Sequence, residues 1–346
     1  MSTGSSPKEA AAETVEPTTD NLLPGDHWAQ QYDDVDSVLG SEASESTASM
    51  SSSILEYRTI HGRTYHSERG DANYWGSNDE QQTESMDMNH HVLTLAIGGK
   101  LHLAPLGKDI KKAVDIGTGT GIWAIDFADE YPGCSVIGTD VSPIQPSWVP
   151  PNLQFQIDDC TQEWTFEDGS LDYVHMRYMT GSIVDWKALF REAFRCCAPG
   201  GYMESLESSP WFKSDDGTVT DTSAMGQWGK LFVEGSKKLG RTFTMVPDGL
   251  QREGMEEAGF VDIQEFDMKV PVGDWPKDPK LREIGRFARA TLEQDVEGYV
   301  LYMATMQGWS KEEVTLYAAH FRRELRNTAI HGYFHMKVVW GKKPDA

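Results

Sequence analysis

At 346 residues the chain is long for a single domain, and a hydrophobic fraction of only 39% suggests that part of it lies outside the packed core. Its 54 acidic and 31 basic residues give a net charge of −23, which argues against a nucleic-acid interface and against binding to anionic membranes. No run of about 18 apolar residues is present, so we expect no transmembrane helix.

The first 52 residues differ in composition from the rest of the chain. Ser, Thr, Glu, Asp and Ala dominate, and Lys8 is the only basic residue before Arg58. Such a segment cannot bury enough apolar surface to offset the entropy of ordering it. We therefore expect residues 1–52 to form a disordered, acidic, Ser-rich tail, with a short ordered exception around Trp28 to Tyr32. Residues 53–346 are expected to form the folded domain.

A long helix is predicted from Asn78 to Lys100, after a stretch of aromatic and charged residues without a clear period. Asp79 suits its first turn, apolar residues recur on one side, and Gly98-Gly99 ends it. The helix carries the histidine pair His90-His91. Packing is our first interpretation of this pair and chemistry our second.

The strongest motif predicts a buried strand, a tight turn and a helix. Asp115 is followed by three glycines, Gly117, Gly119 and Gly121, that alternate with small residues. Glycines let a ligand approach the backbone closely, and the helix that follows presents unpaired N–H groups. A dinucleotide fingerprint would need a glycine where Ile122 stands, and no G-x-x-x-x-G-K-[ST] motif is present. The pattern therefore indicates a nucleotide-like ligand and disfavours a nicotinamide oxidoreductase.

Two further predicted strands, Ser135–Asp140 and Leu153–Ile157, lead into carboxylates. In open α/β sheets, ligands bind beyond the carboxyl ends of the strands. We expect Asp140 to accept hydrogen bonds from two ribose hydroxyls. Asp159 is expected to meet the exocyclic amine of an adenine, and Cys160 to contact its ring.

The rest of the chain continues the alternation of strands and helices. The predicted ranges are a strand at 171–176, a helix at 186–196, and strands at 201–206, 259–266 and 330–340. Strands joined by helices at short spacing require a parallel sheet with right-handed crossovers. Residues 207–248 and 275–329 read as helical insertions that form a cap over the ligand edge of the sheet.

Together these segments resemble the fungal class I S-adenosylmethionine (SAM) methyltransferases of the LaeA-like group. The likeness rests on the glycine loop, His90-His91, residues 144–152, His175-Met176-Arg177 and residues 275–278, and it extends from about Tyr57 to the C-terminus. The resemblance implies an α/β three-layer sandwich. It also implies a mostly parallel seven-stranded sheet with the last strand antiparallel, and SAM as the cofactor.

The motifs and the resemblance together predict the cofactor contacts. These are Asp115, Gly117, Thr118, Gly119, Gly121, Asp140, Asp159, Cys160, His175, Met176 and Tyr65. The sequence departs from the family in two places. Met88-Asn89 stands where Leu-Gln is more usual, and Cys160 stands where a small alanine is usual.

A general base is needed only if the methyl acceptor must lose a proton. The candidates are His175 and, second, His91, because an unperturbed histidine titrates near neutrality. The four cysteines lack metal-ligand spacing, so we expect no metal site. Free thiols are typical of a reducing compartment. We therefore expect a cytoplasmic protein, with an additional nuclear location as the alternative.

Two functions remain open at this level. The first is methyl transfer from SAM to a small organic acceptor in fungal secondary metabolism, which the aromatic and Met residues between Trp211 and Met306 favour as an enclosing apolar cap. Ordinary core packing explains those residues equally well. The second is a LaeA-like regulator that methylates a protein or serves as a SAM-binding subunit, with a protein partner at the tail or the cap. The acidic tail favours it.

Overall fold

The computed structural model describes residues 22–29, 57–67 and 74–345. A seven-stranded sheet in the order β5-β4-β3-β6-β7-β9-β8 forms its centre. The strands are β3 (Lys112–Ile116), β4 (Ser135–Asp140), β5 (Leu153–Ile157), β6 (Leu171–Arg177), β7 (Cys197–Ser208), β8 (Val261–Pro271) and β9 (Tyr333–Lys342). Strands β3 to β7 pair in parallel, and β9 runs antiparallel to both β7 and β8. This confirms the predicted sheet and its antiparallel last strand.

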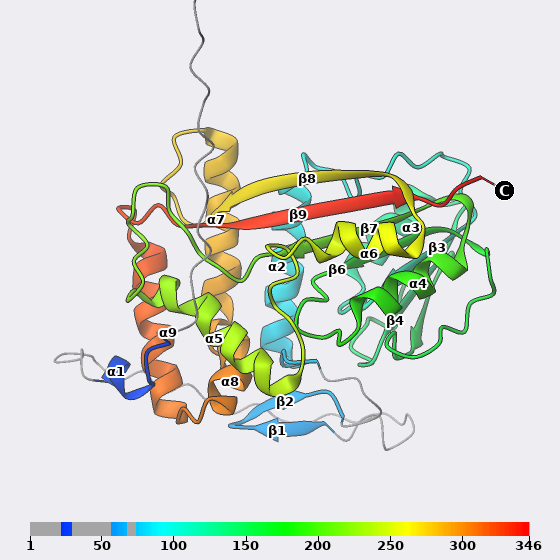
Figure 1. Ribbon diagram of the computed structural model, residues 1–346. Coiled ribbons are helices and arrows are strands. Elements are labelled where there is room, and N and C mark those ends of the chain that lie inside the picture. The colour runs from blue at the N-terminus through cyan, green and yellow to red at the C-terminus, as the bar shows by residue number, and fades with distance from the viewer. Residues whose placement is uncertain (1–21, 30–56, 68–73, 346) are drawn as a thin grey trace, which may run out of the picture.

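Helices cover both faces of the sheet and make it a three-layer structure (Figure 1). On one face of the sheet, Ala113 lies in a core with α3 (Ile122–Glu130). On the other face, its neighbour Val114 lies in a core with α4 (Trp186–Cys196) and α6 (Leu250–Ala258). Successive residues of a strand point to opposite faces, so this alternation is what a doubly covered sheet requires.

Four helices gather beyond the carboxyl ends of the parallel strands and form the cap. They are α5 (Ala224–Leu239), α7 (Pro279–Gln294), α8 (Val296–Met306) and α9 (Lys311–Arg326). The long ribbon of β8 and β9 reaches from the sheet to this cap (Figure 1). Trp228 of α5 stacks on Phe321 of α9 at 4.5 Å between ring centroids, and Phe212 meets Trp228 edge-on at 5.7 Å. The cap helices lie within the two predicted insertions.

The segment 22–29 is packed on the cap. Trp28, in α1 (Asp26–Ala29), is 2% exposed and lies edge-on to Tyr317 at 5.0 Å. The backbone N–H of Leu23 donates to Gln227 at 2.7 Å. The ordered exception expected around Trp28 therefore begins earlier in the chain, at residue 22, because Leu22 and Leu23 also pack on this core. The remainder of 1–52, including residues 30–32, lies outside the described residues.

A two-stranded sheet of β1 (Arg58–Ile60) and β2 (Arg63–Tyr65) is tied to the caps of two helices. Arg63 pairs with Asp79 at 2.5 Å and with the fully buried Asp295 at 2.6 Å. Asp79 is the N-cap of α2 (Glu80–Ala96) and Asp295 the N-cap of α8. The predicted helix at 78–100 is thus shorter at both ends, because Asp79 caps its start and Gly98 and Gly99 follow its end with positive φ.

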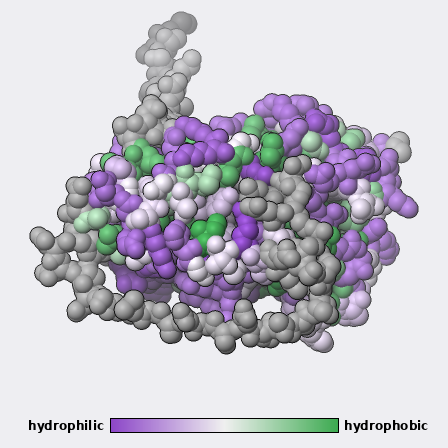
Figure 2. Space-filling model, turned by 90° about the horizontal axis from the view of Figure 1, so that it is seen from below, coloured by the Kyte–Doolittle hydropathy of each residue, from purple (hydrophilic) through white to green (hydrophobic). Residues whose placement is uncertain are grey.

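One face of the molecule shows the polar character that the composition suggests (Figure 2). The face that carries the β1–β2 sheet is mostly hydrophilic, with apolar residues in small separate groups (Figure 2). None of the helices in the described part of the chain is long and apolar enough to cross a membrane.

Candidate functional site

A cavity lies where the glycine loop meets the carboxyl ends of β4, β5 and β6, and α2 lines its other side. Its empty volume is about 1260 Å³, part of which opens to solvent. Six of the residues predicted to contact a cofactor line this cavity: Gly117, Thr118, Gly119, Asp140, Asp159 and Cys160. The structure therefore brings together the carboxylates of two successive strand ends and the glycine loop, as the sequence predicted.

The glycines of the loop serve two different purposes. Gly117 has φ 67°, and a Cβ there would lie 2.2 Å from the sulfur of Met179. Gly121 has φ 81°, and a Cβ there would lie 2.2 Å from the ring of Phe155 on β5. Both need a left-handed backbone that favours glycine. Gly117 forms cavity wall, whereas Gly121 lets the helix start pack on the sheet and does not line the cavity.

The carboxylates at the strand ends are held by backbone donors. Asp140 accepts the N–H of Gly119 at 2.8 Å and that of Ser142 at 2.9 Å. Burial raises the pKa of Asp140 to about 6, although these two hydrogen bonds lower it. Asp159 accepts the N–H and the hydroxyl of Thr161 through its Oδ1. Burial also raises the pKa of the Cys160 thiol, so it stays protonated at neutral pH.

Asp115 and His175 lie behind the glycine loop, not in the cavity. His175 Nδ1 lies 2.7 Å from Asp115 Oδ1, and the hydroxyl of Thr118 donates to Asp115 Oδ2 at 2.6 Å. The His175 ring stacks on Trp123 at 3.6 Å and is 1% exposed. Burial lowers the pKa of His175. These residues stabilise the glycine loop from the side away from the cavity. The geometry therefore gives no support to His175 as a general base.

Three other predicted residues also lie outside the cavity. Met176 is fully buried in the core next to α4, because residues of a strand alternate in direction. Tyr65 is fully buried, and its ring packs against Tyr302 at 5.7 Å between centroids. His91 is exposed and its ring lies 4.4 Å from that of Phe287. None of the three is placed to contact a ligand in the cavity.

Sequence reasoning missed a row of cavity residues on α2. Gln82, Met86, Asn89, His90 and Leu93 all line the cavity from α2. Their spacing of three and four residues marks one helix face, so the signal was present in the sequence. The last residue of β6 and the two residues after it, 177–179, also line the cavity.

Arg177 is a cation in the cavity wall without a carboxylate partner. Its Nη1 donates to His90 Nδ1 at 2.9 Å, while His90 Nε2 lies 2.9 Å from Asp126. In the described part of the chain, no carboxylate lies within ion-pairing distance of Arg177. Burial and the charge of Arg177 lower the pKa of His90 to about 4, so this imidazole is neutral at pH 7. The site thus offers a positive charge to an anionic ligand group.

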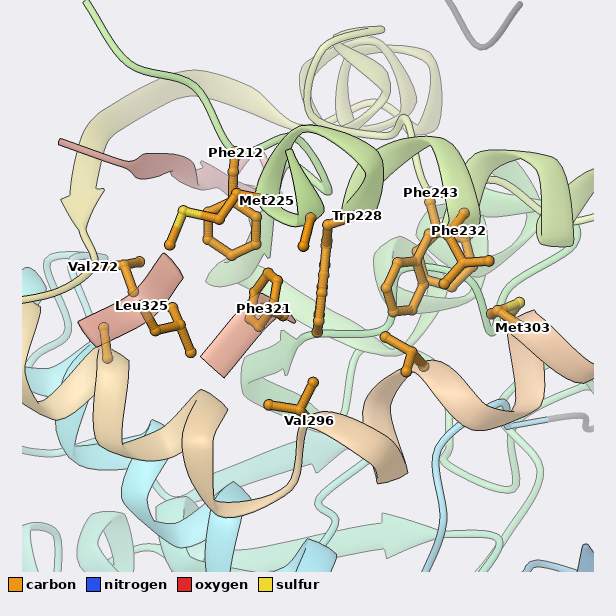
Figure 3. Close-up of a cluster of buried hydrophobic side chains, with 14 of the residues drawn as sticks. Phe212, Met225, Trp228, Phe232, Phe243, Val272, Val296, Met303, Phe321 and Leu325 are labelled. Carbon is orange, nitrogen blue, oxygen red and sulfur yellow. The ribbon is translucent and has the colours of Figure 1, made fainter. Parts of the chain in front are cut away.

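A second cavity, of about 720 Å³ empty volume, adjoins the first. The two share four lining residues: Trp75, Asn89, Tyr178 and Tyr299. The far side of the second cavity is aromatic, and four of its residues are seen together in Figure 3: Phe212, Trp228, Phe232 and Phe243. The side chains of the cap therefore enclose a hollow as well as pack a core.

The chain resembles known proteins over most of its length. Residues 88–265 match the protein family described as "Methyltransferase domain". Methyltransferase pytC of Aspergillus terreus is 38% identical over 305 residues, which cover 88% of this chain and 93% of that protein. Secondary metabolism regulator LAE1 of Cochliobolus heterostrophus is 32% identical over 291 residues, covering 82% and 94%. A solved phosphoethanolamine N-methyltransferase 2 of Haemonchus contortus, in complex with SAM, aligns with a TM-score of 0.47 at 20% identity, covering 75% of this chain and 53% of that one.

Proposed function

Because this chain belongs to the methyltransferase domain family and is a SAM-dependent methyltransferase, we propose that its acceptor is a small, mostly apolar molecule of fungal secondary metabolism. One observation carries the proposal. An aromatic cavity adjoins the cofactor cavity and shares Trp75, Asn89, Tyr178 and Tyr299 with it. Ligand sites are typically enclosed, mostly apolar and supplied with a few polar groups, and the second cavity has these properties.

The residues of the first cavity suit three of the polar parts of SAM: the ribose, the adenine and the methionine carboxylate. Asp140 would accept the ribose hydroxyls, and Asp159 the exocyclic amine of the adenine, with Cys160 beside the ring. Gly117 and Gly119 leave room for the ligand along the loop. Arg177 would pair with the carboxylate of the methionine moiety, since it is the cation in this wall without a carboxylate partner among the described residues.

Methyl transfer mainly requires that the acceptor atom is aligned with the methyl group and the sulfur of SAM. SAM carries an electrophilic methyl group on a sulfonium. The protein must hold an acceptor atom in line with it, and such positioning supplies on the order of 7–11 kcal/mol in favourable cases. The cap supports this role because Tyr299 of α8 lines both cavities and so forms part of the passage between them. Among the described residues, no histidine, carboxylate or lysine lines the second cavity, so we propose that no side-chain base is used there.

Labelled methyl transfer tests the proposal. The protein is incubated with methyl-labelled SAM and a fungal extract split into small-molecule and protein fractions. Label is expected in the small-molecule fraction. Ala288, on α7, lines the second cavity, so Ala288→Phe should fill it, abolish this transfer and leave SAM affinity within about twofold. Label in the protein fraction alone would overturn the proposal.

A regulatory role is the second candidate, and the 32% identity to a secondary metabolism regulator favours it. In that case the acceptor is a protein, or the chain serves as a SAM-binding subunit whose partner contacts the cap or the N-terminal segment. Label in the protein fraction would support it. We also propose a reducing compartment, cytoplasmic or alternatively nuclear, since all four cysteines are free thiols and three are buried. A fluorescent fusion of the full chain tests this location.

A further inference from the structure

Tyr178 has an unusual backbone at the passage between the two cavities. It directly follows β6 and has φ 53°, in the left-handed region that bulky residues avoid. Among the described residues, His61 and Asp262 are the other non-glycine residues with positive φ, and both are exposed. Tyr178 is half-buried instead. Such strain costs roughly 1–3 kcal/mol and persists only where surrounding contacts enforce it.

Those contacts come from the end of β7. The N–H of Tyr178 donates to the carbonyl of Leu206 at 2.9 Å. The carboxylate of Glu207 then accepts the next two backbone donors, Met179 N–H at 2.9 Å and Thr180 N–H at 3.1 Å. On the other side, the indole N–H of Trp75 donates to the carbonyl of Thr180 at 3.0 Å. The three residues that follow β6 are thereby locked in place.

The carboxyl group that holds this turn, that of Glu207, lies in an environment that disfavours its charged form. Glu207 is fully buried, and burial raises its pKa to about 8 even though the two backbone N–H groups lower it. A buried acid is costly unless its partners are specific. Since an apolar side chain could fill the same space, the carboxylate is explained by the conformation that it enforces on residues 178–180.

The hydroxyl of Tyr178 lies in a cavity that is mostly apolar but is also lined by the polar side chains of Thr180, Ser209 and Thr291. Burial raises the pKa of this hydroxyl, whereas the side chains of Ser208 and Asn89 nearby lower it. Both also line the second cavity, and Asn89 lines the first as well. Opposite them stand the aromatic rings of Trp75, Phe212, Trp228, Phe232, Phe243 and Phe334. A ligand that matches this cavity has a planar, mostly apolar skeleton with a polar group at the passage.

The second cavity has no charged lining residue in the described part of the chain, and this limits which polar group its ligand can carry. An aliphatic amine has a pKa of about 10 and would enter the second cavity as a cation. No carboxylate among the described residues lines this cavity to pair with it. A phenol or enol hydroxyl arrives neutral and can both donate to and accept from Asn89 and Tyr178.

We propose that Tyr178 is a catalytic residue that hydrogen-bonds the reacting hydroxyl of a phenol- or enol-type acceptor, and that Glu207 is a positioning residue that fixes Tyr178. This rests on the proposed function. The acceptor oxygen forms the bond to the methyl carbon, the carbon–sulfur bond breaks with its electrons left on sulfur, and the hydroxyl proton passes to solvent water. The product is a methyl ether.

Variants of the full chain test the roles of the two residues. Labelled SAM and the small-molecule fraction serve as substrates. Tyr178→Phe should lower kcat at least 30-fold and leave the Kd for SAM within twofold. Tyr131→Phe is the matched control, because it removes another hydrogen-bonded phenol outside both cavities, 2.9 Å from His102, and should change neither. Glu207→Gln keeps one acceptor and should lower kcat more than it changes the KM for SAM.

A double-mutant cycle separates positioning from simple destabilisation. If Glu207 acts through Tyr178, adding Glu207→Gln to Tyr178→Phe should cost less than threefold further in kcat. Fully multiplicative losses, or a Tyr178→Phe rate within threefold of wild type, would overturn the proposal. A labelled product that proves to be an N-methyl compound or a methyl ester would overturn the acceptor class. No small-molecule label from the wild type would instead refute the proposed function itself.

Discussion

Replacing Asp140 by Asn is the sharpest perturbation of the cofactor site. The amide has the same shape, but it cannot accept the N–H of both Gly119 and Ser142 as the carboxylate does. It would also lose the charge-assisted part of the two ribose hydrogen bonds proposed for Asp140. Hydrogen bonds to charged groups contribute about 1.5–3 kcal/mol and neutral ones about 0.5–1.5 kcal/mol. We expect SAM binding to weaken by about 3 kcal/mol, or on the order of a hundredfold in Kd.

Calorimetric titration with SAM at pH 8, where Asp140 is ionised, measures this loss. Asp129→Asn makes the same charge change on an exposed residue of α3 and should bind like wild type. The reasoning is refuted if Asp140→Asn binds SAM within threefold of wild type and melts at the same temperature. Such a result would mean that the carboxylate does not contact the ligand.

The pH dependence of SAM affinity follows from the same residue. Burial raises the pKa of Asp140 to about 6 in the ligand-free protein, and donors on the ribose favour its ionised form. Below pH 6 binding must therefore expel a proton, so Kd should rise about tenfold from pH 7 to pH 5. The carboxyl and amino groups of SAM titrate outside this range. A flat profile for wild type, or a sloped one for Asp140→Asn, would contradict the assignment.

Other substitutions test the loop, the fold and the base. Gly117→Ala adds left-handed strain of about 1–2 kcal/mol and drives a Cβ onto Met179, so Kd for SAM should rise more than tenfold by calorimetry. Gly217→Ala has the same sign of φ with no atom within 4 Å, and should leave that Kd unchanged. Arg63→Ala leaves the buried Asp295 unpaired and should lower the free energy of unfolding in urea by about 3 kcal/mol, whereas a loss below about 1 kcal/mol would disprove the pairing. His91→Ala should keep kcat within twofold in the labelled assay, and a hundredfold loss would restore it as a base.

The sheet and half of the candidate cofactor site were predictable because their signals are local. The range of β4 was predicted to the residue, and Asp140 follows from its position at the end of that strand. The glycine pattern and Ile122 excluded a dinucleotide fold from spacing alone. Residues within one motif keep a fixed geometry, so their spacing in the sequence determines the distances between them in the structure.

Other parts of the site depend on contacts that sequence spacing does not express. Strand alternation turns Met176 into the core, and His175 points at Asp115 instead of the ligand. The second cavity joins α2, the end of β7, α5 and α7, which are separated by long stretches of chain. The proposed role of Tyr178 depends on the backbone of residues 178–180, which is hydrogen-bonded by Leu206 and Glu207 of the neighbouring strand β7.

A structure of the protein with S-adenosylhomocysteine and the purified acceptor tests the central claim most directly. The acceptor is predicted to lie among Phe212, Trp228 and Phe243, with the atom that receives the methyl group at the passage beside Tyr178. An acceptor bound on the outer surface of the cap, or a protein segment entering the first cavity, would contradict this account.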